Sequence, residues 1–191
     1  GNRVRGRVAV HGAKNSALPI LAAAAVCGDS VIENCPRLTD ISVAMEILGH
    51  LGCRARRGGD AILTTQGGPG DCRIPDELMG AMRSSIVFLG GMVARHGCAE
   101  LTLPGGCELG ARPIDLHLFA LSQMGADITE AGGRLYCSAP RGLHGARINL
   151  SFPSVGATEN TIIAAATARG ETVLTGAARE PEILDLIDFL R

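Results

Sequence analysis

The chain has 191 residues, of which 46% are hydrophobic, and a formal net charge of −1. This balance gives no electrostatic footprint for nucleic acid, and no apolar run approaches the roughly eighteen residues that a membrane span needs. The basic N-terminus also lacks the continuous apolar region of a signal peptide. We therefore expect a soluble, globular, cytoplasmic protein whose partners include neither nucleic acid nor membrane.

Hydropathy periodicity in the first part of the chain predicts a unit of the order βαβαββ. Helical spacing is clearest at Ile41, Ala44, Leu48 and Leu51, in a segment that opens with Thr39 or Asp40 as a cap and ends at Gly52. The predicted elements are a strand at 3–10, a helix at 15–27, a strand at 30–34, a helix at 39–52, and two strands at 53–57 and 61–65.

The same order of elements recurs further along the chain. Gly52 and Gly125 end equivalent helices 73 residues apart (125 − 52), so the chain contains an internal repeat. The second unit is predicted as a strand at 71–74, a helix at 82–94, a strand at 99–103, a helix at 113–125, and strands at 126–130 and 134–138. The third is predicted as a strand at 146–150, a helix at 156–170, a strand at 171–176, and a helix from Pro181.

The third unit is expected to be incomplete. The helix of the second unit runs 12 residues from Pro113 to Gly125, so the glycine equivalent to Gly125 would fall at position 193, two beyond Arg191. We therefore predict an α/β fold of repeated βαβαββ units whose last two strands are absent. On this interpretation the sequence is a piece of a longer protein.

The cysteines and histidines show no pattern typical of a metal site. The seven cysteines are widely spaced, and no pair has the spacing of a zinc ligand set or a redox motif. We expect six of them to be reduced structural thiols, and the five histidines to be surface or packing residues. No metal and no other cofactor is predicted.

Three basic side chains lie where helices are predicted to begin, namely Lys14, Arg83 and Arg112. A helix N-terminus offers unpaired N–H groups and the positive end of the helix dipole, so anionic ligands bind there readily. Any one of these residues alone is more typical of a solvated surface charge. Lys14 differs because it is the only lysine among the 18 basic residues, and lysine is a compact, mobile charge that two anionic groups can share.

Cys107 is the one cysteine whose surroundings do not resemble a protein core. It follows Gly105 and Gly106 and precedes Arg112 and the predicted helix at 113–125. A nearby cation and a helix N-terminus both favour the thiolate form, which a reactive cysteine requires, although Glu108 opposes this. The residues alone thus favour a functional thiol without specifying its reaction.

Four motifs, "GAKNSALP", "LPGGCELGARPIDLH", "FPSVGATEN" and "AAREPEI", resemble those of the UDP-N-acetylglucosamine 1-carboxyvinyltransferases, the enolpyruvyl transferases that begin bacterial peptidoglycan synthesis. They occur in order across essentially the whole chain. The resemblance implies an inside-out α/β barrel of such units. It also implies transfer of the enolpyruvyl group of phosphoenolpyruvate to the 3′-hydroxyl of UDP-N-acetylglucosamine, with release of phosphate.

The resemblance also implies roles for individual residues. Cys107 would be the catalytic proton donor and the target of the epoxide fosfomycin. Lys14 and Asn15 would contact phosphoenolpyruvate and the sugar, and Arg83 and Arg112 would meet phosphates. The uridine pocket would be lined by Arg112, Pro113, Ile114, Asp115, Leu116, Phe152, Pro153, Ser154 and Val155.

The family has two similar domains with the active site between them. The resemblance therefore implies that residues 1–13 form a strand of an absent second domain, and that residues 14–191 form one truncated domain. The carboxylate base and further arginines would belong to the missing C-terminal half, so this chain alone is expected to be inactive. Two alternatives remain open: a non-catalytic UDP-sugar-binding fragment, and a relative of 5-enolpyruvylshikimate-3-phosphate synthase, which does not use the "PGGC" loop.

Overall fold

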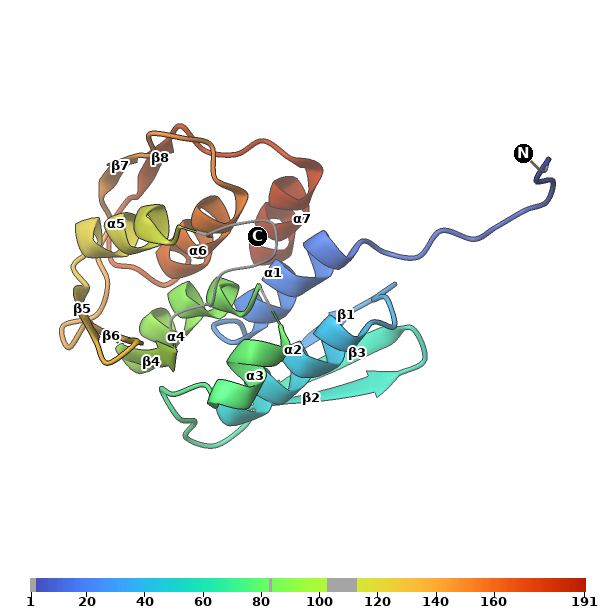
Figure 1. Ribbon diagram of the computed structural model, residues 1–191, viewed down its shortest axis with the longest axis horizontal. Coiled ribbons are helices and arrows are strands. Elements are labelled where there is room, and N and C mark those ends of the chain that lie inside the picture. The colour runs from blue at the N-terminus through green and yellow to red at the C-terminus, as the bar shows by residue number, and fades with distance from the viewer. Residues whose placement is uncertain (1–2, 83, 103–112) are drawn as a thin grey trace.

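A computed structural model describes residues 3–82, 84–102 and 113–191 of the chain. Its elements follow one another as three related α/β units (Figure 1). The repeated α/β organisation predicted from the sequence is therefore confirmed.

The first unit joins two helices to a three-stranded antiparallel sheet of order β1-β3-β2. Ile41, Ala44, Leu48 and Leu51 are fully buried, as their helical spacing predicts. The turn between the last two strands contains Gly59, whose φ of 64° favours glycine. The elements are α1 (Lys14–Ala24), β1 (Ser30–Ile32), α2 (Thr39–His50), β2 (Cys53–Gly58) and β3 (Ala61–Gln66).

The second unit repeats this sheet as β4-β6-β5, again antiparallel. Gly125, with φ of 93°, follows the last helix of this unit as Gly52, with φ of 80°, follows α2 of the first unit. The elements are α3 (Asp76–Ala81), the 3₁₀ helix η1 (Ser85–Val87), α4 (Phe88–His96), β4 (Cys98–Thr102), α5 (Asp115–Gln123), β5 (Asp127–Ala131) and β6 (Arg134–Ser138).

Two predictions for the second unit were wrong in detail. The strand predicted at 71–74 is only a parallel bridge between Arg73 and Glu100. Pairing stops after Ile74 because Pro75 has no backbone N–H to donate. The helix predicted at 82–94 begins only at Phe88, after η1, and the short helix α3 was not predicted.

The third unit contains β7 (Arg147–Asn149), α6 (Val155–Ala165), β8 (Val173–Thr175) and α7 (Pro181–Leu190). β7 and β8 pair in parallel, as the bridge of Arg73 with Glu100 does in the second unit. Within residues 3–82, 84–102 and 113–191, no two further strands complete a three-stranded sheet here.

The strand predicted at 3–10 is not formed. This segment runs away from the rest of the chain (Figure 1), and Val4, Val8 and Val10 are 96%, 89% and 90% exposed. Alternating valines need a neighbouring strand to pair with, and none of the described strands lies beside them. That the segment belongs to a second domain stays a prediction.

The interior is built from α1, α4 and α6, which contact one another while the sheets lie around them (Figure 1). These helices can approach one another closely because the residues at their contacts are small. Ala22 to Ala25 are fully buried, and a methyl group at Gly90 would overlap the backbone oxygen of Asn160. Among the described residues, no helix is long and apolar enough to cross a membrane.

Six cysteines fall within the described residues, and all six are free thiols. Cys35, Cys53 and Cys137 are buried, and burial is the main cause that raises the pKa of each. Thiols held in the protonated form inside a core are unreactive. The structural role predicted for these three is therefore confirmed.

Candidate functional site: a cleft at helix N-termini

A cleft of about 790 Å³ lies where several helices begin. Its walls are the first residues of α1, α5 and α6, together with the segment that contains η1 and single residues of α2 and α7. The lining residues are Lys14, Asn15, Leu18, Pro19, Asp40, Ala81, Ser84, Ile86, Val87, Pro113, Ile114, Asp115, Leu116, His117, Phe152, Ser154, Val155, Gly156, Glu159 and Glu182.

The helix ends at this cleft suit an anionic ligand. α1 and α5 have no side-chain cap among the described residues, so their first N–H groups are available. At α6 the side chain of Ser154 accepts a hydrogen bond from the Ala157 N–H at 3.3 Å. The repeat produces this arrangement because equivalent helices begin on the same side of the fold.

Lys14 is held at the cleft by Asp40. The Lys14 Nζ lies 2.9 Å from Asp40 Oδ2, and the two side chains are 45% and 28% exposed. A pair as exposed as this contributes little to stability, so its main effect is to fix the position of the ammonium group. Asp40 was considered in the sequence only as part of a helix start. Its place beside Lys14 depends on the packing of α1 against α2.

Most of the predicted binding residues come together in this cleft. Nine of them line it, namely Lys14, Asn15, Pro113, Ile114, Asp115, Leu116, Phe152, Ser154 and Val155. Pro153 lies next to two lining residues but does not line the cleft itself. Cys107, Arg83 and Arg112 lie outside the described residues. The roles assigned to all of these residues remain predictions.

His117 contributes a buried neutral imidazole to the cleft wall. Asn160 accepts a hydrogen bond from the Gly90 N–H at 2.6 Å and donates to the Ile86 carbonyl at 2.9 Å. The same amide nitrogen lies 2.8 Å from His117 Nδ1, so Nδ1 is the acceptor and the ring proton is on Nε2. Burial lowers the pKa of His117 to about 4, partly opposed by Asp115.

Glu159 is another titratable residue in the wall of the cleft, and like His117 it was not singled out from the sequence. It lies on α6, four residues after Val155 and therefore on the same helix face, and its residue is 8% exposed. Burial, with smaller contributions from Glu182 and Glu180, raises the pKa of its carboxyl group to about 8. Glu159 is therefore protonated at neutral pH.

The raised pKa of Glu159 predicts a pH-dependent stability. In the unfolded chain the carboxyl group ionises near pH 4.5, whereas the folded chain keeps its proton up to about pH 8. Wild-type stability should therefore fall through this window, by roughly 1.4 kcal/mol per pH unit at most. Glu159→Gln should remove this fall. Urea unfolding of both proteins at pH 5, 6, 7 and 8 measures the difference, and parallel curves would contradict the prediction.

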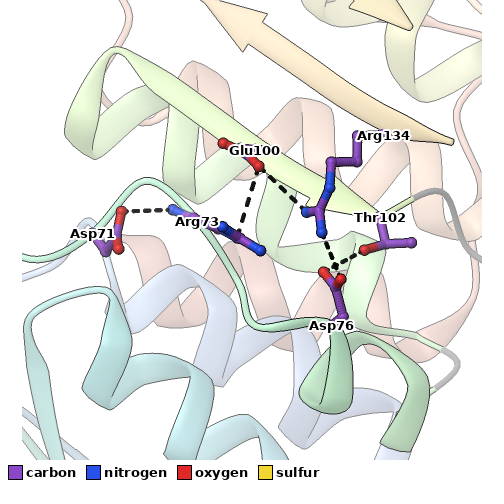
Figure 2. A network of polar contacts seen from close by, with 6 residues as sticks. All are labelled: Asp71, Arg73, Asp76, Glu100, Thr102 and Arg134. Carbon is purple, nitrogen blue, oxygen red and sulfur yellow. Dashed lines mark hydrogen bonds and ion pairs between the residues drawn. The ribbon is translucent and has the colours of Figure 1, made fainter. Parts of the chain in front are cut away.

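A separate polar network ties α3 to the second sheet (Figure 2). Thr102 donates to Asp76 Oδ1 at 2.6 Å, and Arg134 pairs with both Asp76 and Glu100, at 2.5 and 3.3 Å. The hydrogen bond from Thr102 and the charge of Arg134 lower the pKa of Asp76. The network fixes Thr102, the last described residue before 103–112.

Within the described residues, no three His, Cys, Asp or Glu side chains are arranged to hold a metal ion.

Comparison with known families gives this fold and cleft a context. A family model for EPSP synthase (3-phosphoshikimate 1-carboxyvinyltransferase) matches residues 1–191. The chain belongs to the EPSP synthase family. Within this family it is similar to UDP-N-acetylglucosamine 1-carboxyvinyltransferase 2 of Caldanaerobacter subterraneus subsp. tengcongensis, with 50% identity over 191 residues, which is 100% of this chain and 46% of the relative. It is 47% identical over 196 residues to UDP-N-acetylglucosamine 1-carboxyvinyltransferase 1 of Symbiobacterium thermophilum, covering 100% and 44%.

Two solved structures share the fold. The enolpyruvyl transferase NikO from Streptomyces tendae superimposes with a TM-score of 0.84 at 25% identity, over 100% of this chain and 45% of NikO. An EPSP synthase from Acinetobacter baumannii gives a TM-score of 0.71 at 18% identity, over 94% and 42%. The chain therefore has the repeated α/β architecture of the enolpyruvyl transferases and spans less than half the length of the curated relatives it matches.

Proposed function

We propose that this chain is the N-terminal part of a bacterial UDP-N-acetylglucosamine 1-carboxyvinyltransferase. The observation that carries this proposal is the cleft, which gathers nine residues of the motifs that resemble that family at the starts of α1, α5 and α6. Identity of 50% to a protein of that name supports the same assignment. We assign the reaction to the cytoplasm, as expected from the composition of the chain.

The proposed reaction needs an acid, fixed cations and a base. Protonation of the enol carbon of phosphoenolpyruvate builds positive charge at the neighbouring carbon, which the sugar 3′-hydroxyl then attacks. We assign the proton donor to Cys107 and contacts with phosphoenolpyruvate and the sugar to Lys14 and Asn15. Arg83 and Arg112 are assigned to phosphate groups. Loss of phosphate from the tetrahedral addition product, together with a proton from its new methyl group, re-forms the double bond and gives the enolpyruvyl ether.

We assign the uridine pocket to residues 112–116 and 152–155, which include seven of the nine predicted residues that line the cleft. The second proposed partner is the remaining half of the protein, which would supply the base and further arginines. This division is supported by the 46% coverage of the Caldanaerobacter relative.

One alternative within the family is transfer to shikimate 3-phosphate, because the matching family model is described by that reaction. The "PGGC" motif at 104–107 and the similarity to UDP-sugar enzymes favour the UDP-sugar acceptor. A second alternative is a UDP-sugar-binding fragment without catalysis. The cleft is compatible with ligand binding in all three cases. The identity of the acceptor substrate and the reactivity of the Cys107 thiol therefore distinguish the three proposed functions.

Selective alkylation tests the proposal. We expect Cys107 to react faster with an epoxide or iodoacetamide than any of the other six thiols, three of which are buried, and UDP-N-acetylglucosamine to change that rate. Shikimate 3-phosphate should leave the rate unchanged. Peptide mass spectrometry of the folded chain, with and without each compound, measures both effects. Preferential labelling of another cysteine, or a response to shikimate 3-phosphate alone, would overturn the assignment.

A further inference from the structure

Glu159 is a carboxylic acid in the wall of the cleft whose presence the proposed reaction does not explain. The segment that carries it continues as "NTIIAAA", so the helix is otherwise built to pack against the core. Its carboxyl group has no hydrogen bond and no ion pair with any residue of 3–82, 84–102 or 113–191. Glu159 nevertheless lines the cleft, with 8% of the residue exposed.

Charges around Glu159 disfavour its anion. Glu182 lines the same cleft from α7, and Glu180 precedes that helix; both raise the pKa of Glu159. α1 contributes Lys14, whose ammonium group is already paired with Asp40 of α2. Among residues 3–82, 84–102 and 113–191, the other titratable and charged groups of the cleft wall and its rim are Lys14, Asp40, Asp115, His117, Glu180 and Glu182.

A largely buried carboxylic acid without a protein partner destabilises a fold, because it loses part of its hydrogen bonding to water and gains none from the protein. An apolar residue of similar size would remove this cost at a position that serves packing alone. An acid retained in a cleft wall is explained if a bound molecule accepts its hydrogen. Anionic oxygens are the strongest acceptors for such a donor.

We propose that Glu159 is a specificity-determining residue that, in its neutral form, donates a hydrogen bond to an anionic phosphate or carboxylate oxygen of the ligand in the cleft. This inference rests on the proposed function, whose two substrates both carry such oxygens. Ionised Glu159 would instead repel the ligand. The cleft therefore accepts anions only while Glu159 keeps its proton, and the fixed Nε2–H of His117 provides a second neutral donor in the same wall.

Calorimetric titration of the chain with UDP-N-acetylglucosamine, and separately with phosphoenolpyruvate, at pH 6, 7, 8, 9 and 9.5 tests the proposal. Wild-type affinity should be constant up to about pH 8 and then fall by about tenfold per pH unit. Glu159→Gln keeps a donor that cannot ionise, so it should bind as wild type at pH 6 and show no such fall. The ligand whose affinity responds is the one whose oxygen Glu159 contacts.

Two further variants serve as controls. Glu180→Gln removes a neighbouring negative charge, so the fall should begin at a lower pH than in wild type. Glu77→Gln makes the same substitution on the exposed surface of α3 and should leave the profile unchanged. Wild type and Glu159→Gln profiles that coincide would overturn the inference.

Failure of the inference and failure of the proposed function are distinguishable. If neither substrate binds wild type at pH 6, the proposed function fails. The same pH series is then run with pyrophosphate as the probe, with the Glu159 carboxyl followed by ¹³C NMR. A rise of its titration midpoint on addition of pyrophosphate supports the inference, and an unchanged midpoint, whether through no contact or no binding, overturns it.

Discussion

The 191-residue chain alone should release no measurable phosphate from phosphoenolpyruvate and UDP-N-acetylglucosamine, whereas the same chain joined to the remaining residues of the Caldanaerobacter relative should do so. Under the proposed function the chain supplies the acid and one set of cations but neither the base nor the further arginines. Charge that develops in the transition state would then face water instead of fixed donors, and most of the electrostatic stabilisation would be lost.

The measurement is a coupled phosphate-release assay on both proteins, with UDP-N-acetylglucosamine or shikimate 3-phosphate as the acceptor. The joined protein should turn over only with the UDP-sugar. Circular dichroism of the short chain confirms that a lack of turnover is not a lack of folding. Comparable turnover by the short chain would show that the second half is not needed, and turnover with shikimate 3-phosphate would replace the proposed acceptor.

Lys14→Arg should lower turnover of the joined protein far more than it lowers stability. Lys14 begins α1 at the cleft, and its ammonium group is held 2.9 Å from Asp40. Arginine keeps the charge but replaces a compact group with a planar fork that cannot occupy the same place between two anions. We expect the barrier to rise by about 2–4 kcal/mol, which is roughly a 30- to 900-fold loss of kcat/KM.

Thermal unfolding provides the control for this variant. Because the pair of Lys14 and Asp40 is partly exposed and arginine keeps the charge, the Tm of Lys14→Arg should lie close to that of wild type. Asp40→Asn should lower turnover less, since it loosens the ammonium group without removing it. Near-normal turnover of Lys14→Arg would make Lys14 an ordinary surface charge.

Periodicity predicted the elements that pack against the core. The helix at Thr39–His50 and the hairpin that follows it were found within two residues of their bounds, because their buried positions repeat at regular intervals. α3 was missed because its six residues are too few to show a helical period. Its signal was Pro75 followed by Asp76 and Glu77, a proline at a helix start with acidic residues in the first turn.

The cleft could be predicted only in part. Most of its predicted residues were assigned from the resemblance of four motifs, and among the described residues only Lys14 was also singled out by its place at a predicted helix start. Asp40, His117 and Glu159 were not found, because each depends on which helices pack together. In a sequence, a histidine or glutamate within an apolar helix is typical of a packing or surface residue. Its role depends on its neighbours in the fold, such as Asn160, whose amide nitrogen lies 2.8 Å from His117 Nδ1.

The contact between Gly90 and Asn160 links the interior of the fold to the cleft. Gly90 lets α4 lie so close to α6 that its N–H meets Asn160 Oδ1 at 2.6 Å, and the same amide orients His117. The separation of the two central helices and the orientation of the imidazole are therefore not independent variables. A substitution at this helix contact that moved α4 away from α6 would therefore also rotate the His117 ring in the cleft wall. The residues at this contact are constrained by ligand recognition as well as by packing.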